Sequence, residues 1–339
     1  MPRITTPEEL FFPVATHPVY TRPTDSGSES EILISNRLAV VNVRSNEVLG
    51  VVGRDYRLVT NHEACTYARK CARAVFPDTV EDEWEIFAAD APQSRIYCHI
   101  DLRHTTGNLD FGYVMAGTRE EVPDTYGPYI RVTNSYNGQR ALRFSIGCYR
   151  KVCENGLTAA GDIISFSFAH TRDNIQTEID FVVDHERVQK MKQEFTAAFD
   201  VLRRYKFDRK YGKELVQAVL AIRMPLNARE EQNIPFNAFQ RDWFRLDGYI
   251  DSLYTRYADR LGDNAYAALQ AATELASHPI ENLCLRRDKH MLQRLAGEWL
   301  VDFKGHCEEA EFELSNYLKR STHGHETHAI SGRFTAPME

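Results

Sequence analysis

Long hydrophobic runs are missing from this chain of 339 residues. No stretch reaches the roughly 18 consecutive apolar residues that a membrane-spanning helix needs. The first residues, Met1 to Glu9, also lack the basic region followed by an apolar region that marks a secretory signal. We therefore predict neither a membrane span nor a secretory signal, and no membrane partner.

Familiar cofactor and catalytic motifs are missing as well. The seven cysteines are dispersed, and no two of them have the two-residue gap of a structural zinc site. The chain holds no glycine-rich phosphate loop, no Gly-x-Ser-x-Gly elbow and no His-Glu-x-x-His pair. We expect free thiols in a reducing cytoplasm, no cofactor and no structural metal, and these absences favour a protein that is not an enzyme.

The overall charge is moderately negative, with 41 basic and 48 acidic residues and a net charge of -7. A composition of 43% hydrophobic and 26% charged residues is that of an ordinary globular protein, which excludes disordered, collagenous and coiled-coil classes. The negative balance argues against a protein that coats DNA over its whole surface. It leaves room for a local basic groove.

Four segments follow from the way composition changes along the chain. Residues 1–36 contain spaced prolines and a Ser/Gly-rich run, which predict an extended N-terminal arm. Residues 37–180 have the pattern of strands with one embedded helix, 181–320 that of amphipathic helices, and 321–339 that of a flexible tail. The predicted fold class is α+β, with an antiparallel β-rich N-terminal domain that includes a packed helix and an α-helical C-terminal domain.

Local patterns predict most elements within these segments. Thr60 and Glu63 form a capping-box signature ahead of a helix that reaches Val75 before Pro77. Strands are expected at 38–43, 48–52, 84–88, 95–102, 111–117, 129–133, 140–148 and 163–169, and helices at 188–202, 215–222, 243–257, 266–277 and 286–319.

The most informative window runs from Thr125 to Cys153, because it contains no Asp or Glu while basic and aromatic residues are interleaved. Side chains alternate along a strand, so Arg143 and Tyr149 should project opposite to Phe144. Cations attract phosphates and aromatic rings stack on bases, which together hold single-stranded nucleic acid. A solvated sheet face is the alternative interpretation. The predicted phosphate contacts are Arg131, Arg140, Arg143, Arg150 and Lys151, and the predicted stacking surfaces are Tyr136 and Tyr149.

A second basic run extends from Arg203 to Lys213, with six cations against one acid. Arg203, Arg204 and Lys206 are predicted to add contacts to nucleic acid. Cations at the C-terminus of a helix are also favoured by the helix dipole, so a purely structural role stays open.

The expected strand from Arg95 to Arg103 places His99 and Asp101 on one face, two residues apart. Both are residue types that bind metal ions in hydrolases. Because a third ligand at a suitable spacing is missing, they are weak candidates for a metal site.

Several segments resemble one family, the phage/plasmid-like proteins with a domain of unknown function 932. The resemblance is carried by residues 48–56, 61–64, 133–138, 152–157 and 264–274, together with His278. It implies a protein of phages, prophages or plasmids in the cytoplasm of a bacterial host, and it supplies no catalytic residues. The N-terminal arm departs from the usual beginning of the family.

Taken with the basic window, these observations favour a protein that binds nucleic acid, and single-stranded DNA in particular, in the recombination or replication of a mobile element. One alternative is a protein-binding effector that acts on a host defence or replication factor. A metal-dependent hydrolase that uses His99 and Asp101 is a further alternative. A homo-oligomer is compatible with each of these functions.

Overall fold

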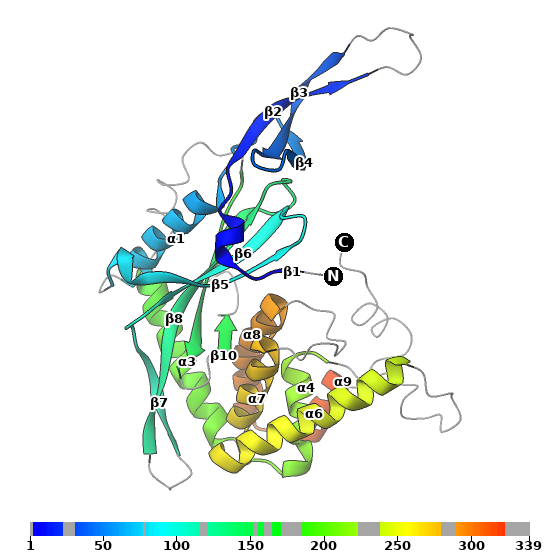
Figure 1. Cartoon of the computed structure of the whole chain (residues 1–339). Coiled ribbons are helices and arrows are strands. Elements are labelled where there is room, and N and C mark those ends of the chain that lie inside the picture. Colours follow the sequence, from blue (N-terminus) through cyan, green and yellow to red (C-terminus); the bar gives the residue numbers. More distant parts are fainter. Residues whose placement is uncertain are drawn as a thin grey trace. The chain divides into compact units, whose positions relative to one another are not determined.

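The computed structural model of the chain describes residues 3–22, 31–76, 79–115, 121–151, 155–158, 165–170, 185–222, 238–278 and 289–322 (Figure 1). The predicted tail, 321–339, lies outside the described residues from 323 onward. Antiparallel strands dominate the N-terminal half of the chain and helices the C-terminal half, so the predicted α+β class is confirmed. None of the described helices combines the length and the apolar composition that a membrane crossing needs.

Backbone contacts divide the chain into two compact units. The chain passes between them several times, and one passage lies between residues 188 and 189, near the predicted boundary at 180. Unit 1 contains Met1–Gly107, Gly127–Gly147 and Asp162–Val188, and unit 2 contains Asn108–Tyr126, Cys148–Gly161 and Gln189–Glu339.

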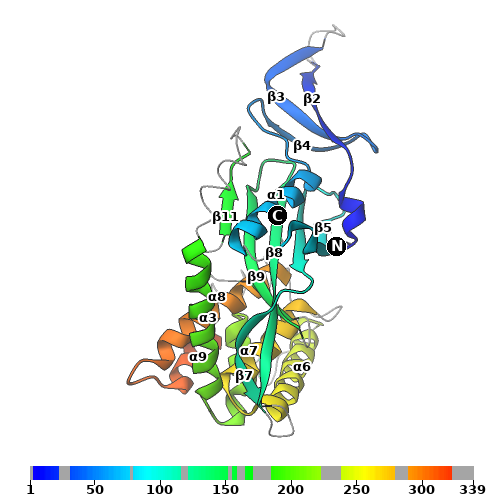
Figure 2. The ribbon, with the colours of Figure 1, turned by 90° about the vertical axis from the view of Figure 1, so that its left-hand side faces the viewer.

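A three-stranded antiparallel sheet opens unit 1, with the order β2 (Val14–Thr21), β3 (Ile32–Asn42) and β4 (Glu47–Gly53) (Figure 1, Figure 2). Pro18 lies within β2, which is an edge strand, next to a register irregularity between Pro18 and Val19, and edges and bulges are where sheets tolerate proline. In the turn between β3 and β4, the Asn42 side chain accepts hydrogen bonds from the backbone N–H groups of Arg44 and Ser45. The predicted arm, 1–36, therefore contributes strands to this sheet.

Helix α1 (Asn61–Val75) starts at the capping box that the sequence predicts. Thr60 Oγ1 accepts a hydrogen bond from the backbone N–H of Glu63, and the Glu63 carboxylate accepts one from the N–H of Thr60 at 2.8 Å. The helix packs against β6 (Tyr97–His104) with its small residues, including the buried Ala64 and Ala68. Burial also raises the pKa of the Cys65 thiol to about 12, and the described cysteines form no disulfides.

The larger sheet has the strand order β1, β5, β6, β8, β9, β10 among the described residues, with β7 paired to β8 and β11 paired to β9. The strand pairs β1–β5, β5–β6, β6–β8, β7–β8 and β9–β11 are antiparallel. The predicted strands are all present, with shifted ends. The bounds are β1 Arg3–Ile4, β5 Trp84–Pro92, β6 Tyr97–His104, β7 Leu109–Met115, β8 Glu121–Ser135, β9 Leu142–Arg150, β10 Asn155–Thr158 and β11 Ser165–Phe168.

Helices form the core of unit 2. The central helix, α7 (Ala265–Ser277), is buried along almost its whole length. It packs against β10 and against α4 (Gly212–Val219), α6 (Ala238–Leu261) and α8 (Lys289–Cys307). A single helical stretch predicted at 286–319 is in fact two helices, separated by a turn after Cys307. Glu308, Glu309 and Glu311 lie in this turn, where carboxylates oppose the negative end of the helix dipole. The bounds are α3 His185–Arg204, α4 Gly212–Val219, α6 Ala238–Leu261, α7 Ala265–Ser277, α8 Lys289–Cys307 and α9 Leu314–Thr322.

Candidate nucleic-acid interface

One face of the larger sheet in unit 1 carries the polar residues that the sequence predicts for it. In β6, Ile100 and Leu102 are fully buried on the face that α1 covers, and His99 and Asp101 alternate with them. The register places His99 beside Thr133 of β8 and beside Asp90 of β5. We call this the polar face. It is formed by Glu85, Ala88 and Asp90 of β5, Tyr97, His99, Asp101 and Arg103 of β6, and Tyr129, Arg131 and Thr133 of β8.

An ion pair between Asp101 and Arg131 lies at the centre of the polar face. Arg131 Nε is 2.7 Å from Asp101 Oδ1, and its Nη2 is 2.8 Å from Oδ2, so the guanidinium binds the carboxylate with two parallel hydrogen bonds. Both side chains are almost completely buried. Arg131, predicted to bind a phosphate, thus has its charge balanced inside the protein.

His99 is held by two different partners. Its Nε2 lies 3.4 Å from a guanidinium nitrogen of Arg140, and its Nδ1 lies 2.9 Å from Thr133 Oγ1. Asp101 is bound to Arg131 instead. Over the part of the chain that the structure describes, no group of three or more His, Cys, Asp or Glu residues could hold a metal ion, and no third ligand joins His99 and Asp101.

Two other arginines on the polar face lie over aromatic rings. The guanidinium carbon of Arg140 is 3.9 Å from the centroid of the Tyr97 ring, and that of Arg103 is 3.8 Å from the centroid of Phe87. Phe87 lies at a β-bulge in β5 and is 41% exposed. Both guanidinium groups are therefore held over rings of the same sheet by cation–π contacts.

Arg143 of β9 is exposed and alternates with the fully buried Leu142 and Phe144. Asp124 of β8 and Arg150 of β9 touch, which places the even-numbered residues of these neighbouring strands on one face. The odd-numbered Arg143 therefore extends the polar face. This agrees with the orientation that the sequence predicts for it.

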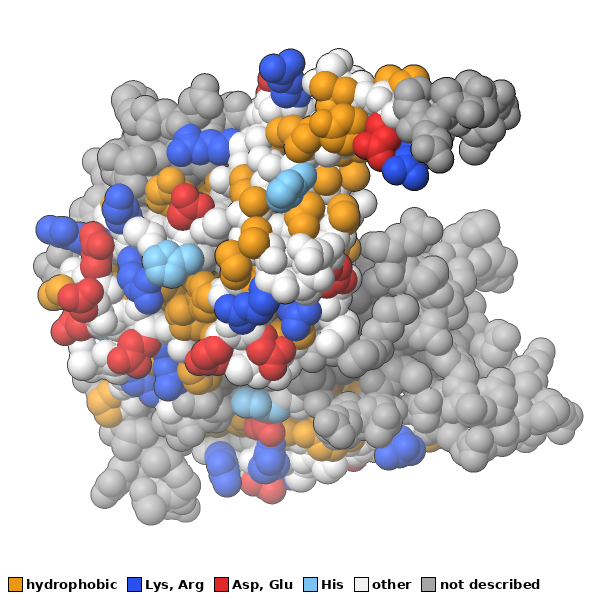
Figure 3. Space-filling view, turned by 45° about the horizontal axis from the view of Figure 1, so that its top comes forward, with side chains coloured by type: hydrophobic (Ala, Val, Ile, Leu, Met, Phe, Trp, Pro, Cys, Tyr) orange, Lys and Arg blue, Asp and Glu red, His pale blue; other side chains and the backbone are white. Residues whose placement is uncertain are grey.

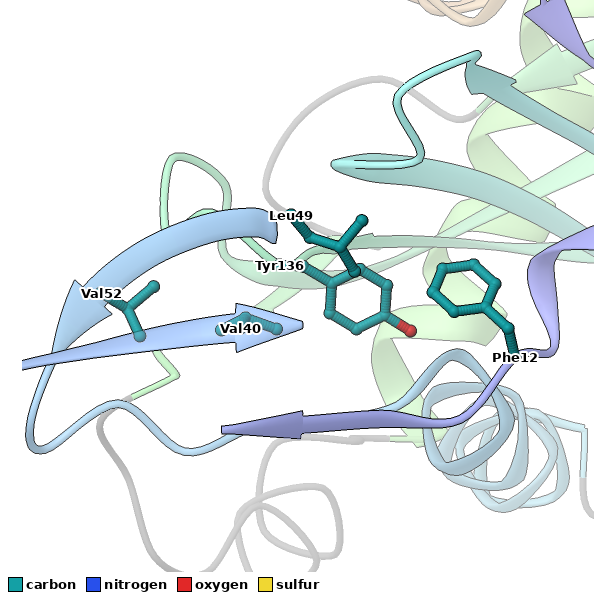
Figure 4. Packing of buried hydrophobic residues seen from close by; sticks show 5 residues of the cluster. All are labelled: Phe12, Val40, Leu49, Val52 and Tyr136. Atoms are coloured by element: carbon teal, nitrogen blue, oxygen red, sulfur yellow. The ribbon is translucent and has the colours of Figure 1, made fainter. Parts of the chain in front are cut away.

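Tyr136 does not offer an exposed ring for base stacking, because only 1% of it is exposed. Figure 4 shows its ring between Phe12 and Leu49, in a cluster that also includes Val40 and Val52. Its hydroxyl accepts a hydrogen bond from the backbone N–H of Asn61 at 3.0 Å. The residue joins the three-stranded sheet to the start of α1. Tyr149, the other predicted stacking residue, is also buried, with 8% exposed.

Arg150 and Arg203 belong to a buried network in unit 2. Arg150 Nε is 2.7 Å from Asp124 Oδ1, and Arg203 Nη2 is 2.8 Å from Oδ2 of the same carboxylate. Tyr266 also donates to Asp124 through its hydroxyl. Burial, and after it the neighbouring Asp124 charge, raises the pKa of the Tyr266 hydroxyl far above its usual range. These two predicted contacts therefore connect β8, β9, α3 and α7 within the protein interior.

The remaining predicted contacts are accessible. Arg204 and Lys206 are exposed at the end of α3, and Lys151 is partly exposed with its ammonium group on the side chain of Asn108. Sequence reasoning missed Phe87, because a bulge takes it out of the alternating pattern of β5. It also missed Asp124, since no local pattern links that residue to arginines 26 and 79 positions away.

A comparison with protein families gives one match: the model described as domain of unknown function (DUF932) matches residues 48–297. The same family is the one that the motifs from residue 48 to His278 resemble. Comparisons with curated proteins and with solved structures gave no match. The family description names no activity, so a function has to be argued from the side chains described above.

Proposed function

Since the chain belongs to the domain of unknown function 932 family, whose description assigns no activity, we propose a function from the polar face itself: non-enzymatic binding of single-stranded nucleic acid. The family resemblance suggests a phage or other mobile element in the bacterial cytoplasm as the setting, and within it we propose single-stranded DNA, in recombination or replication, as the nucleic acid that is bound.

The observation that carries the proposal is the arrangement of Arg103, Arg140 and Arg143 on the polar face. Two of these guanidinium groups stack on aromatic rings, and Arg143 is exposed. Cations that track a phosphate backbone beside accessible rings are the common elements of proteins that bind single strands without reading sequence. The rings beside these arginines are Phe87, which is 41% exposed, and Tyr97, which is partly exposed, in place of the buried Tyr136 and Tyr149.

The charge on the polar face is compatible with a phosphate backbone. It holds four arginines, at positions 103, 131, 140 and 143, against three carboxylates. Because Asp101 is already neutralised by Arg131, the carboxylates that remain are Asp90, which is buried, and Glu85. Outside the Asp101–Arg131 pair, three arginines therefore stand against two carboxylates, of which Glu85 is the cross-strand neighbour of Arg103.

The test is a fluorescence anisotropy titration of the full chain with a labelled oligonucleotide, single-stranded and duplex, at several salt concentrations. Arg143→Ala should weaken single-strand binding and reduce the log-log salt slope by about 0.7, the contribution of one phosphate contact. Phe87→Ala should weaken binding by about 1 to 3 kcal/mol for a lost stacking contact and leave the salt slope nearly unchanged.

Arg73→Ala is the matched control, because Arg73 is an exposed arginine on α1, away from the polar face. It should leave both affinity and slope unchanged. Wild-type protein that shows no salt-sensitive binding at low ionic strength, or variants of Arg143 and Arg73 that behave alike, would reject the proposal.

Of the alternatives, the protein-binding function is favoured by one observation. The three-stranded sheet has an apolar face that is exposed to solvent, and such faces are typical of protein interaction sites. No comparable observation favours the metal-dependent hydrolase, since His99 and Asp101 each have other partners.

A further inference from the structure

The first described residues of the chain, 3–12, form a short segment that lies against unit 1. β1 (Arg3–Ile4) pairs with Ala91 and Pro92 of β5, and the residues Pro7–Leu10 form a single 3₁₀ turn, η1, that packs against the same strand. Both Figure 1 and Figure 2 show this part of the chain, in dark blue, beside β5. We call residues 3–12 the N-terminal segment.

Three apolar side chains attach the N-terminal segment to unit 1. Ile4 is 3% exposed, Leu10 1% and Phe12 8%, whereas Thr5 and Glu8, which lie between the first two in sequence, are exposed. The segment therefore buries a few large side chains and leaves its polar ones in water. Peptides bound to protein surfaces are commonly held in the same way, because a few buried residues carry most of the binding energy.

A side chain of α1 also binds the backbone of the N-terminal segment. Asn61, which is 3% exposed, donates a hydrogen bond from Nδ2 to the carbonyl oxygen of Leu10 at 2.9 Å. Its backbone N–H donates to the Tyr136 hydroxyl at 3.0 Å, and the Tyr136 ring centroid lies 5.9 Å from that of Phe12 (Figure 4). The surface under the segment thus combines apolar contacts with a hydrogen-bond donor for a peptide carbonyl. We call it the docking surface, formed by Asn61, Ala91, Pro92 and Tyr136.

The docking surface and its occupant belong to different parts of the chain. All four residues of the docking surface lie within 48–297, the region that matches the family model, whereas the N-terminal segment precedes this region. Asn61 and Tyr136 are also members of the motifs that carry the family resemblance. A surface of the family domain is therefore covered by a segment that the family model does not include.

The docking surface differs from the exposed apolar surface of the three-stranded sheet. Hydrophobic side chains gather there as well (Figure 3), and Val48 and Val51 are 57% and 50% exposed, but no described residue covers them. At the docking surface the structure itself shows an occupant, with its three buried side chains and its hydrogen-bonded carbonyl group. The occupant defines what kind of segment the surface accepts.

The N-terminal segment has few attachments for its length. Ordering residues 3–12 costs conformational entropy, which the three buried side chains and the two-residue β1 ladder have to offset. Segments with few buried contacts detach locally more often than core elements do. We propose that the docking surface is a peptide-binding site that this chain fills with its own N-terminal segment. Its partner is a segment of another protein that presents an aliphatic residue and, two positions later, an aromatic one, as Leu10 and Phe12 do. The proposal does not depend on the binding of nucleic acid.

Fluorescence anisotropy of a labelled peptide with the sequence of residues 1–13, titrated with the full chain, tests the proposal. In the wild type the chain's own segment competes at a high effective concentration, so the peptide should bind weakly. Leu10→Asp places a charge at a position that is 1% exposed and should release the segment. The peptide should then bind at least about tenfold more tightly than to the wild type, because the open state is more populated. Leu10→Ala, a milder change, should give an intermediate affinity, and circular dichroism shows whether each variant is folded.

Thr5→Asp is the matched control, since it introduces the same charge at an exposed position of the N-terminal segment. It should bind the peptide as weakly as the wild type does. A peptide that itself carries Leu10→Asp should bind none of these proteins. The proposal is overturned if the folded Leu10 variants bind the peptide no better than the wild type, or if the substituted peptide binds equally well. Loss of the folded state in Leu10→Ala also overturns it, because the segment would then be a part of the core that cannot leave.

Discussion

The three-stranded sheet and the larger sheet differ in which side chains they leave exposed to solvent. In the three-stranded sheet, Val48 is 57% exposed and Val51 50%. In the larger sheet, the charged residues Asp101 and Arg131 are only 7% and 4% exposed. Both arrangements run against the usual preference of these residue types. The charged pair is tolerated inside because each group satisfies the other, while the valines stay outside because no described part of the chain covers them. Burial is thus decided by the available partner as much as by hydrophobicity.

The largest change in stability is expected from breaking the buried ion pair between Asp101 and Arg131. Asp101→Asn removes the charge that balances Arg131 and leaves a guanidinium buried without its counter-ion, which should lower the free energy of unfolding by about 3 to 5 kcal/mol. Urea denaturation monitored by circular dichroism measures this. Asp82→Asn, at an exposed carboxylate, is the control and should stay within about 0.5 kcal/mol of the wild type. A cost below about 1 kcal/mol for Asp101→Asn would mean that the pair is solvated.

The next largest change in stability is expected at Gly50, in the three-stranded sheet. A Cβ atom added at Gly50 would lie 2.5 Å from Asn137 Cα and 2.9 Å from the backbone oxygen of Tyr136. Since backbone atoms have to move, Gly50→Ala should destabilise the protein by about 1 to 3 kcal/mol. Gly53→Ala lies in the same strand with no atom within 4 Å, and should change stability by less than about 1 kcal/mol. Equal melting temperatures for the two variants would contradict the close approach.

A smaller, pH-dependent effect is expected from His170, another buried polar residue of unit 1. Its Nδ1 lies 3.2 Å from the carbonyl oxygen of Arg57, and its ring stacks on Tyr56 at 4.8 Å. Burial lowers its pKa from the usual 6.5, with the Arg57 carbonyl acting in the opposite direction. The unfolded chain therefore binds the proton more readily, and stability should fall as pH drops below about 6.5.

His170→Gln should reduce this loss of stability between neutral and acidic pH, because glutamine binds no proton. Chemical denaturation at a series of pH values provides the measurement. Identical pH profiles for wild type and variant would show that the histidine charges as easily in the folded protein as in the unfolded chain.

The smallest change in stability is expected at the exposed valines of the three-stranded sheet. Val51→Thr replaces a methyl group by a hydroxyl that water can solvate, so the monomer should change in stability by less than about 0.5 kcal/mol. The same substitution at Val40, which is fully buried in the neighbouring strand, places a hydroxyl among apolar groups and should cost about 1 to 3 kcal/mol. Thermal unfolding at a concentration where the protein is monomeric compares the two. A large loss at Val51 would show that this side chain is already packed within one chain.

Local sequence patterns predict correctly those features that depend on interactions between residues close together in the chain. The Thr60–Glu63 capping box predicts the start of α1 because both hydrogen bonds join residues three positions apart. Alternation in β6 predicts that His99 and Asp101 share a face, since the period of a strand is a backbone property. The break after Cys307 was missed because helical periodicity continues across it while the charge pattern opposes it.

The sequence by itself determined the α+β class, most of the strands and helices, and the shared face of Tyr97, His99, Asp101 and Arg103 in β6. Only the tertiary structure decided which of those residues remain accessible. Arg131, Arg150 and Arg203 carry the same charge as Arg143, yet they are paired with Asp101 and Asp124, which long-range folding brings to them. Tyr136 is likewise buried, because Phe12 and Leu49, which lie far away in the sequence, pack against it. Residue type sets what a side chain can bind, whereas its exposure depends on partners that the three-dimensional fold supplies.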